Sequence, residues 1–323
     1  MTRPLAGAVC VIVGGGGFLG ANLALALRAQ GAEVRAFGRT RYFDAPLKGV
    51  RWMGGTLDDM QKLSNLIDGA DVVFHLAGTS TPASAEANRL EDVKGSVLGT
   101  INLLDLCRTL KVDRVIFTSS GGTVYGDAPD APFTEKTLPQ PISSYGINKL
   151  SAEFYFQLYN TTYGMKNVVL RIANPFGPYQ HGLKNQGVIP IFMRKALAGE
   201  PLRIWGDGSV TRDYLFGEDV AQAMIAAATY TGPEAVFNIG SGVGRSLNEV
   251  IGNLETVLAR QIAVEYRPAR GLDVPVSVLD CALAARELNW HPQSDWCTAL
   301  RTTCDWIRED MGLLPDTGDT DGN

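Results

Sequence analysis

A tyrosine and a lysine four residues apart could perform acid–base chemistry. Tyr145 and Lys149 lie in SSYGINKLSAE, which has the pattern of a helix, so both side chains rise from one helix face. A phenol has a pKa of about 10, too high for a base at neutral pH, but a neighbouring ammonium favours the phenolate and lowers that pKa. The pair predicts a phenol base that takes a proton from a substrate hydroxyl. The alternative is an ordinary surface Tyr-Lys pair.

A glycine-rich turn follows the first apolar run of the chain. In VCVIVGGGGFLGANLALALRAQ, residues Gly14, Gly17 and Gly20 have the spacing G-x-x-G-x-x-G between a strand and a helix. Glycine lets a pyrophosphate approach main-chain N–H groups, and the helix N-terminus adds partial positive charge. A plain structural turn is the alternative, but the strand–helix–strand context favours a dinucleotide. A positively charged nicotinamide ring near Tyr145 would lower the pKa of the phenol further.

The second strand of this unit ends without an acidic residue. An acid at this position usually binds the adenosine ribose 2′-hydroxyl and repels a 2′-phosphate. The sequence has Gly38 instead, followed by Arg39 and Arg41. With no carboxylate and two cations close by, the sequence predicts weak discrimination between NAD and NADP.

Alternating strands and helices must position these residues. Apolar runs predict strands at 9–13, 34–37, 72–76, 115–119 and 168–172, and helical patterns lie between them at 21–30, 57–68, 92–110 and 145–163. The apolar runs are continuous, as in buried parallel strands, so the pattern predicts an α/β fold with a doubly wound parallel sheet, a Rossmann domain.

The regular alternation stops after Asn174, which predicts a smaller α+β substrate-binding lobe. We expect the dinucleotide-binding domain at 1–173 and 214–241, the second lobe at 174–213 and 242–311, and a disordered tail at 312–323. Asp280 is the expected N-cap of a short helix within 280–290.

Length and composition exclude several classes of protein. A chain of 323 residues is long enough for two lobes. The net charge of −5, without a block of Lys or Arg, argues against nucleic acid or an anionic membrane as partner. No apolar run has the length of a membrane span, and the start of the chain does not resemble a signal peptide. Five separated cysteines and three scattered histidines predict reduced thiols in the cytoplasm and no metal site.

Four further stretches complete a resemblance to a known family. DVVFHLAGTS, VIFTSSGGTVYGD, SSYGINKLSAE and LRIANPFGP, together with the glycine turn, resemble the extended short-chain dehydrogenase/reductase family over roughly 9–290. The similarity is greatest to the nucleotide-sugar epimerase/dehydratase branch. It implies an NAD-dependent 4-epimerase of UDP-glucose and UDP-galactose, and of the N-acetylated pair, that acts through transient oxidation at C4. The alternatives are a nucleotide-4-ketosugar reductase and a non-catalytic dinucleotide-binding regulator.

The resemblance also implies roles for individual residues. Ser120 would hydrogen-bond the reacting hydroxyl beside Tyr145 and Lys149, with Ser119 and Thr123 as alternatives because SSGGTVYG is one residue longer than the commonest pattern. The implied cofactor-binding residues are Gly14, Gly17, Phe18, Leu19, Gly38, Arg39, Thr56, Leu57, Leu76, Ala77, Gly78, Ser119, Tyr145 and Lys149. The implied substrate-binding residues are Ser80, Ser120, Tyr145, Asn174, Val188, Arg212, Arg270, Asp273 and Ser277. Arg212 and Arg270 would bind the diphosphate, the turn at 204–209 would lie beside the base, and helices 92–110 and 145–163 would form a homodimer through a four-helix bundle.

Some positions depart from the family pattern. Gly121 and Gly122 stand where dehydratases of the branch carry an Asp-Glu pair, which argues against a 4,6-dehydratase. Ser96 stands where the family usually has Asn, and Thr56 where it usually has Asp near the adenine. Seven residues past Arg270, the small Ser277 implies space for an acetamido group on the sugar, unless it faces away from the ligand.

Overall fold

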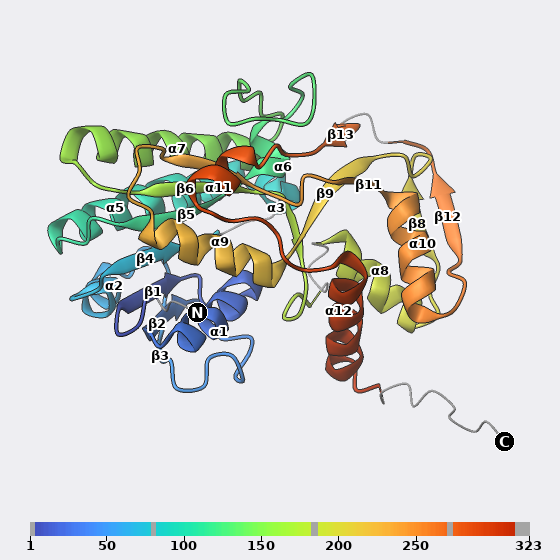
Figure 1. The fold of residues 1–323 in the computed structure, drawn as a ribbon, viewed down its shortest axis with the longest axis horizontal. Coiled ribbons are helices and arrows are strands. Elements are labelled where there is room, and N and C mark those ends of the chain that lie inside the picture. The colour runs from blue at the N-terminus through green and yellow to red at the C-terminus, as the bar shows by residue number, and fades with distance from the viewer. Residues whose placement is uncertain (1–3, 79–81, 182–186, 270–273, 314–323) are drawn as a thin grey trace.

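The computed structural model describes residues 4–78, 82–181, 187–269 and 274–313. Figure 1 shows a larger part, built on one extended sheet, beside a smaller part that contains helices α8 (Val188–Leu197), α10 (Leu247–Leu258) and α12 (Trp296–Asp310). No helix among the described residues is long and apolar enough to cross a membrane.

A seven-stranded parallel sheet forms the larger part. Its strands are β1 (Val9–Val13), β2 (Glu33–Gly38), β3 (Arg51–Gly54), β4 (Val72–His75), β5 (Val115–Ser120), β6 (Val168–Ile172) and β10 (Val236–Ile239). They are ordered β10-β6-β5-β4-β1-β2-β3, so the strand order reverses between β1 and β4. Ligands of open α/β sheets bind at the carboxyl ends of the strands at such a reversal. The predicted doubly wound parallel sheet is confirmed.

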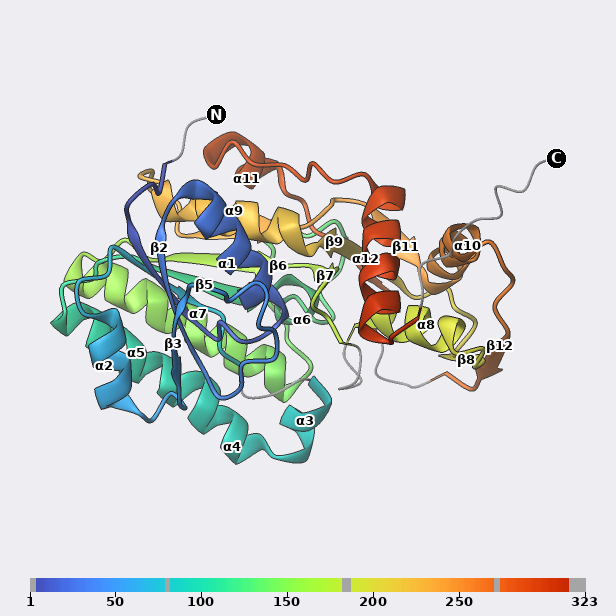
Figure 2. The same cartoon turned by 90° about the horizontal axis from the view of Figure 1, so that it is seen from below.

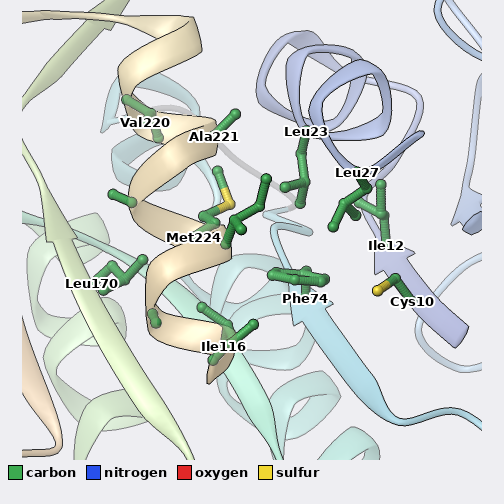
Figure 3. Packing of buried hydrophobic residues seen from close by; sticks show 14 of the residues in the cluster. Cys10, Ile12, Leu23, Leu27, Phe74, Ile116, Leu170, Val220, Ala221 and Met224 are labelled. Atoms are coloured by element: carbon green, nitrogen blue, oxygen red, sulfur yellow. The ribbon is translucent and has the colours of Figure 1, made fainter. Parts of the chain in front are cut away.

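Helices cover both faces of this sheet (Figure 2). Helices α1 (Phe18–Gln30), α9 (Gly217–Thr229) and α11 (Ala282–Glu287) lie on one face, and α2 (Met60–Ile67), α5 (Gly99–Thr109) and α7 (Ser144–Tyr163) on the other. Successive strand residues point to opposite faces. Ile12 therefore belongs with Leu23 and Met224 to the apolar cluster under α1 and α9 (Figure 3), while its neighbour Val11 belongs with Phe156 of α7 to the cluster on the other face.

The smaller part contains two short sheets and a third apolar core. Strands β7 (Asn174–Phe176), β9 (Thr211–Phe216), β11 (Gly244–Ser246) and β13 (Val276–Ser277) form one sheet, and β8 (Leu202–Trp205) and β12 (Val264–Arg267) form the other. Their apolar side chains pack against α8 (Val188–Leu197), α10 (Leu247–Leu258) and α12 (Trp296–Asp310). Helix α10 begins with a capping box in which Ser246 and Glu249 exchange hydrogen bonds.

Several elements differ from the sequence-based expectation. The single helix expected at 92–110 is α4 (Arg89–Val93), a π-helical turn η1 (Lys94–Leu98) and α5. Helix α2 begins at Met60 because the Asp59 carboxylate accepts the Thr56 N–H at 2.8 Å and forms a turn before it. The N-cap of α11 is Cys281 and not the predicted Asp280. Asp280 lies one residue before the N-cap, and its carboxylate accepts the Ala282 N–H at 2.8 Å.

Candidate active site

The glycine turn after β1 lies against the end of β4, where the strand order of the sheet reverses. Gly14 has φ +96°, and a Cβ at this position would lie 2.6 Å from the Ala77 nitrogen and 2.8 Å from the Leu76 carbonyl carbon. The N–H groups of Gly14 and Gly15 both donate to the Phe37 carbonyl, at 2.8 and 3.0 Å. Only glycine permits this backbone and this approach. The structure thus brings the predicted cofactor residues Gly14, Leu76 and Ala77 together.

The N-terminus of α1 opens toward the same place. Its N-cap is Gly17, which offers no side chain to the first N–H groups of the helix. Among the described residues, no atom lies within 4 Å of a Cβ built at Gly78, and only the Gly14 carbonyl oxygen, at 3.7 Å, lies near one built at Gly17. Phe18 lies beside Gly217, while Leu19 packs on the core under α1. Uncapped N–H groups at an open helix N-terminus fit the pyrophosphate of a dinucleotide.

The end of β2 differs from the expectation in one respect. Arg41 turns into its own loop, where its guanidinium pairs with Asp44 at 2.9 Å and donates to the Leu47 carbonyl. Arg39 is exposed. A Cβ at Gly38 would lie 3.3 Å from the Trp52 ring, so the indole occupies the space beside Gly38. The predicted cation Arg41 is thus paired with Asp44, and weak discrimination between NAD and NADP stays a prediction.

Two further predicted cofactor residues lie in the turn just before α2. Thr56 belongs to the turn that Asp59 closes. Leu57 is buried against α5, where a Cβ at Gly99 would lie 2.7 Å from its side chain. Leu57 therefore anchors this loop on the face of the sheet that α5 covers.

Helix α7 carries Tyr145 and Lys149 on one face. Its N-cap is Ser143, whose hydroxyl accepts the Gly146 N–H at 3.1 Å and fixes the start of the helix. The Lys149 Nζ lies 5.8 Å from the centre of the Tyr145 ring. It donates to the Thr118 carbonyl of β5 at 2.7 Å and is buried. The phenol and the amine thus meet at the carboxyl end of β5.

The surroundings shift the pKa values of both groups. Burial, and next the Asp92 carboxylate, raise the pKa of Tyr145 to about 12. Burial lowers the pKa of Lys149 to about 8, although the carboxylates of Glu153 and Asp92 act in the opposite direction. The protein alone therefore shifts the phenol pKa upward, opposite to the expected direction. The physical reason is that burial and a buried carboxylate both disfavour a phenolate.

Three hydroxyls near the end of β5 have different environments. The Ser119 hydroxyl is buried and donates to the Glu153 carboxylate, so it is committed to α7. Ser120 is half-buried at the last position of β5, where α6 (Gly121–Val124) begins. The Thr123 hydroxyl oxygen in α6 is buried and has no hydrogen-bond partner within the described part of the chain. Ser120 and Thr123 both remain candidates for the hydroxyl that contacts a substrate oxygen.

The predicted substrate residues gather around the sheet of the smaller part. Arg212 of β9 pairs in register with Ser277 of β13, and the Asn174 amide of β7 donates to the Asp213 carbonyl of β9 at 3.1 Å. A Cβ at Gly122 would contact the Asn174 amide at 3.6 Å, which places Asn174 beside the end of β5. Val188 is the first residue of α8. The predicted residues Ser80, Arg270 and Asp273 lie outside the described residues.

A cavity of about 590 Å³ lies beside the predicted base-binding turn. It is lined by Trp205, Gly206, Asp207, Ser209, Val210, Ala269, Pro275 and Val276. Val276 and Ser277 are adjacent in β13, so their side chains leave opposite faces of the strand. Because Val276 lines the cavity, Ser277 points away from it, toward the buried side where Arg212 is its strand partner.

Comparison with protein families identifies the chain. A model of the NAD dependent epimerase/dehydratase family matches residues 10–240. The chain belongs to this family. NAD is accordingly its cofactor, and the open N-terminus of α1 beside the glycine turn fits that group.

Individual family members resemble the chain over most of its length. A UDP-glucose 4-epimerase of Mycolicibacterium smegmatis is 34% identical over 238 residues, which are 74% of this chain and 76% of that protein. The structure of a Thermotoga maritima UDP-glucose 4-epimerase with UDP-glucose matches with a TM-score of 0.89 and 31% identity, covering 94% of this chain and 99% of the other. That of Thermus thermophilus UDP-glucose 4-epimerase with NAD matches with a TM-score of 0.85 and 29% identity, covering 93% and 99%.

The sequence analysis did not predict the buried polar residues that lie next to Tyr145 and Lys149. Glu153 and Arg171 form a buried ion pair between α7 and β6, and Asp92 and Asn148 form a buried hydrogen bond between α4 and α7. One available signal was spacing, because Glu153 follows Lys149 by one helical turn on the same face.

Proposed function

We propose that the protein is an NAD-dependent UDP-sugar 4-epimerase. The observation that carries the proposal is the placement of Tyr145 and Lys149 on one face of α7, at the carboxyl end of β5, beside the glycine turn. The similarity to UDP-glucose 4-epimerases supports the same activity. Gly121 and Gly122 support it against dehydration, because neither has a side chain that could act as an acid or a base.

We assign each step of the reaction to residues of the chain. Tyr145 takes the proton of the sugar 4-hydroxyl and later returns it, and Ser120 or Thr123 donates a hydrogen bond to the same oxygen. The Lys149 ammonium, whose Nζ lies 5.8 Å from the centre of the Tyr145 ring, would favour the Tyr145 phenolate. Bound NAD supplies the oxidant that accepts the C4 hydride and gives it back. The diphosphate is bound by Arg212, Arg270 and Asn174. The 4-keto sugar can therefore rotate in the site and present its other face without dissociating.

An NMR assay with a panel of UDP-sugars tests the proposal. The purified protein should interconvert UDP-glucose and UDP-galactose with no net consumption of added dinucleotide. Net oxidation of NADH or NADPH by a 4-keto nucleotide sugar would instead indicate a ketosugar reductase. Dinucleotide binding without turnover of any nucleotide sugar would indicate a regulator.

We further propose that Ser277 lets the site accept N-acetylated sugars. UDP-N-acetylglucosamine and UDP-N-acetylgalactosamine should then interconvert at rates comparable to those of the non-acetylated pair. Ser277→Tyr should lower kcat/KM for the acetylated pair by at least about 10-fold, since the ring would occupy the space of the acetamido group. The measurement is kcat/KM for both pairs in both proteins.

Val276→Tyr is the matched control for this prediction. It adds the same ring one residue earlier, on the face of β13 that lines the cavity near Trp205. It should change kcat/KM for both substrate pairs by similar factors. Equal losses for both pairs in the Ser277 variant, with an unchanged melting temperature, would show that Ser277 does not contact the sugar.

We propose a homodimer through α4, α5 and α7. Ile147, Phe154 and Leu158 form one apolar stripe along α7, with 51%, 62% and 50% of their surfaces exposed. Leu90 and Val93 of α4 are also exposed, and α5 lies beside α7 on the same face of the sheet (Figures 1 and 2). An exposed apolar stripe of this kind is typical of an interface.

Light scattering tests the dimer. The mass in solution should be twice 34.7 kDa, and Phe154→Glu should shift it to the monomer. A wild-type monomer at micromolar concentration would contradict the proposal.

The cytoplasmic location and the two-domain boundaries also remain proposals. The five cysteines of the chain are free, which suits a reducing compartment.

A further inference from the structure

An indole ring fills the space beside the end of β2. Trp52 of β3 pairs in register with Ala36 of β2, and its ring lies beside Gly38, two residues further along β2. A Cβ at Gly38 would lie 3.3 Å from the Cη2 atom of Trp52 and 4.0 Å from its Cζ3 atom. The six-membered part of the indole therefore occupies the place where an acid at the end of this strand would extend its side chain.

The same ring covers one residue of the glycine turn. Gly16 is buried, and a Cβ built there would lie 2.9 Å from Trp52 Cη2 and would collide with the Thr40 carbonyl. The Tyr42 N–H donates to the Gly16 carbonyl at 3.4 Å, so the loop after β2 crosses over this residue. Within the described residues, neither Trp52 nor Thr40 lies within 4 Å of a Cβ built at Gly17. The indole and the loop thus close the turn at Gly16, next to the end of β2.

Three glycines leave the space that this ring needs. Trp52 is half-buried and packs against the apolar core under α1. A Cβ at Gly54, the register partner of Gly38, would lie 3.9 Å from the indole nitrogen. A side chain at Gly16 or Gly38 would have to displace the ring or the loop above it. The core on one side and the glycines on the other therefore define the position of the indole.

The end of β2 is the place where a Rossmann domain distinguishes the two dinucleotides. NADP differs from NAD by a phosphate on the 2′-oxygen of the adenosine ribose, and the residue at the end of this strand contacts that oxygen. An acid there repels the phosphate by its charge. The carbon edge of an indole offers neither a charge nor a hydrogen bond, so a phosphate against it would lose water without gaining a partner. The smaller, uncharged 2′-hydroxyl of NAD would lose much less.

We propose that Trp52 selects NAD over NADP by filling the space that the 2′-phosphate would occupy. Arg39, which is exposed and follows Gly38, would attract the phosphate and so acts in the opposite direction. The missing carboxylate alone predicts weak discrimination, whereas the indole predicts a preference for NAD without a carboxylate. The inference rests on NAD as the cofactor and does not depend on which nucleotide sugar the protein converts.

Calorimetric titration with NAD and with NADP tests this role, on the full-length protein freed of bound dinucleotide. The wild type should bind NAD at least about 10-fold more tightly than NADP. Trp52→Ala opens the space beside Gly38, so the Kd for NADP should fall and the preference for NAD should shrink by at least about 10-fold. The Kd for NAD should change by less than about 3-fold, because its 2′-hydroxyl does not need the space.

Met53→Ala is the matched control on the same strand. Met53 follows Trp52 in β3 and is also half-buried, but it packs against the apolar cluster on the other face of the sheet. Its loss should lower stability and leave the ratio of the two Kd values unchanged. Trp52→Phe keeps an aromatic ring on the core but is shorter than the indole. It should shift the ratio in the same direction by a smaller factor, and it decides the question if Trp52→Ala does not fold.

A double variant tests whether the ring and an acid would act on the same part of the dinucleotide. In Trp52→Ala, Gly38→Asp the indole is gone, so the new carboxylate has room at the end of β2. It should restore a preference for NAD of at least about 10-fold over Trp52→Ala, now by charge repulsion. A ratio that stays at the value of Trp52→Ala would place the ribose 2′-position away from Gly38 and overturn the inference.

The outcomes separate this inference from the proposed function. Equal affinities of the wild type for NAD and NADP, or an unchanged ratio in Trp52→Ala, would overturn the role of Trp52. Equal losses of affinity for both dinucleotides in Trp52→Ala would also overturn it, because the ring would then only support the fold of the site. A protein that turns over no nucleotide sugar, but loses its preference for NAD in Trp52→Ala, would contradict the epimerase proposal and support the role of Trp52.

Discussion

Tyr145→Phe should lower kcat by at least about 10²-fold, which is the lower end of the contribution of acid–base catalysis. The phenylalanine ring keeps the packing on α7 but cannot take the proton of the 4-hydroxyl. The affinity for UDP-sugar should change little, because the binding residues proposed for the diphosphate lie elsewhere, on β7 and β9. Stopped assays give kcat, and calorimetric titration with UDP-glucose gives the dissociation constant.

Tyr163→Phe is the matched control on the same helix. Tyr163 is the last residue of α7, is 52% exposed, and lies against Arg108 rather than Lys149. Its activity should equal that of the wild type. If Tyr145→Phe keeps more than half of the wild-type kcat, Tyr145 is not the base.

The buried parallel strands could be predicted from the sequence because their apolar runs are continuous. Strands β1 and β6 have the predicted bounds, because their apolar runs reflect burial on both faces of the sheet. The edge strand β3 was missed because its four residues RWMG are only half-buried or exposed and have no distinct period. The π-helical turn η1 was missed because the apolar pattern of the helix continues through it without a break.

The candidate site was predictable where one short segment contains the whole signal. The glycine turn and the Tyr145–Lys149 pair are of this kind, because each depends on residues within one turn or one helix. The upward shift of the Tyr145 pKa was not predictable, because it comes from burial in the folded protein and next from Asp92, which lies 53 residues away in the chain. The Arg41–Asp44 ion pair was missed for a different reason: the two residues are close in sequence, but only the geometry of the folded loop brings the guanidinium to Asp44.

Glu153→Gln should lower the free energy of unfolding by about 3–5 kcal/mol, the usual cost of removing one partner from a buried ion pair. The Glu153 carboxylate accepts from the Arg171 guanidinium at 2.7 and 3.0 Å, and the two side chains are 5% and 7% exposed. A neutral amide would leave the guanidinium buried without a counter-charge. The Ser119 hydroxyl would also lose a charged acceptor. Urea unfolding of the wild type and the variant, followed by circular dichroism, measures the difference.

The cost should come from the unpaired charge and not from lost packing. The double variant Glu153→Leu, Arg171→Met removes both charges at similar volume, so it should be more stable than Glu153→Gln although it changes more atoms. Tyr125 would keep its hydrogen bond to Asn238, at 2.7 Å, after Arg171 is replaced. Asp113→Asn is the surface control, because its ion pair with Lys166 is more than half exposed and contributes little. A double variant less stable than Glu153→Gln would mean that the ion pair itself, rather than the avoidance of a lone buried charge, stabilises the contact between α7 and β6.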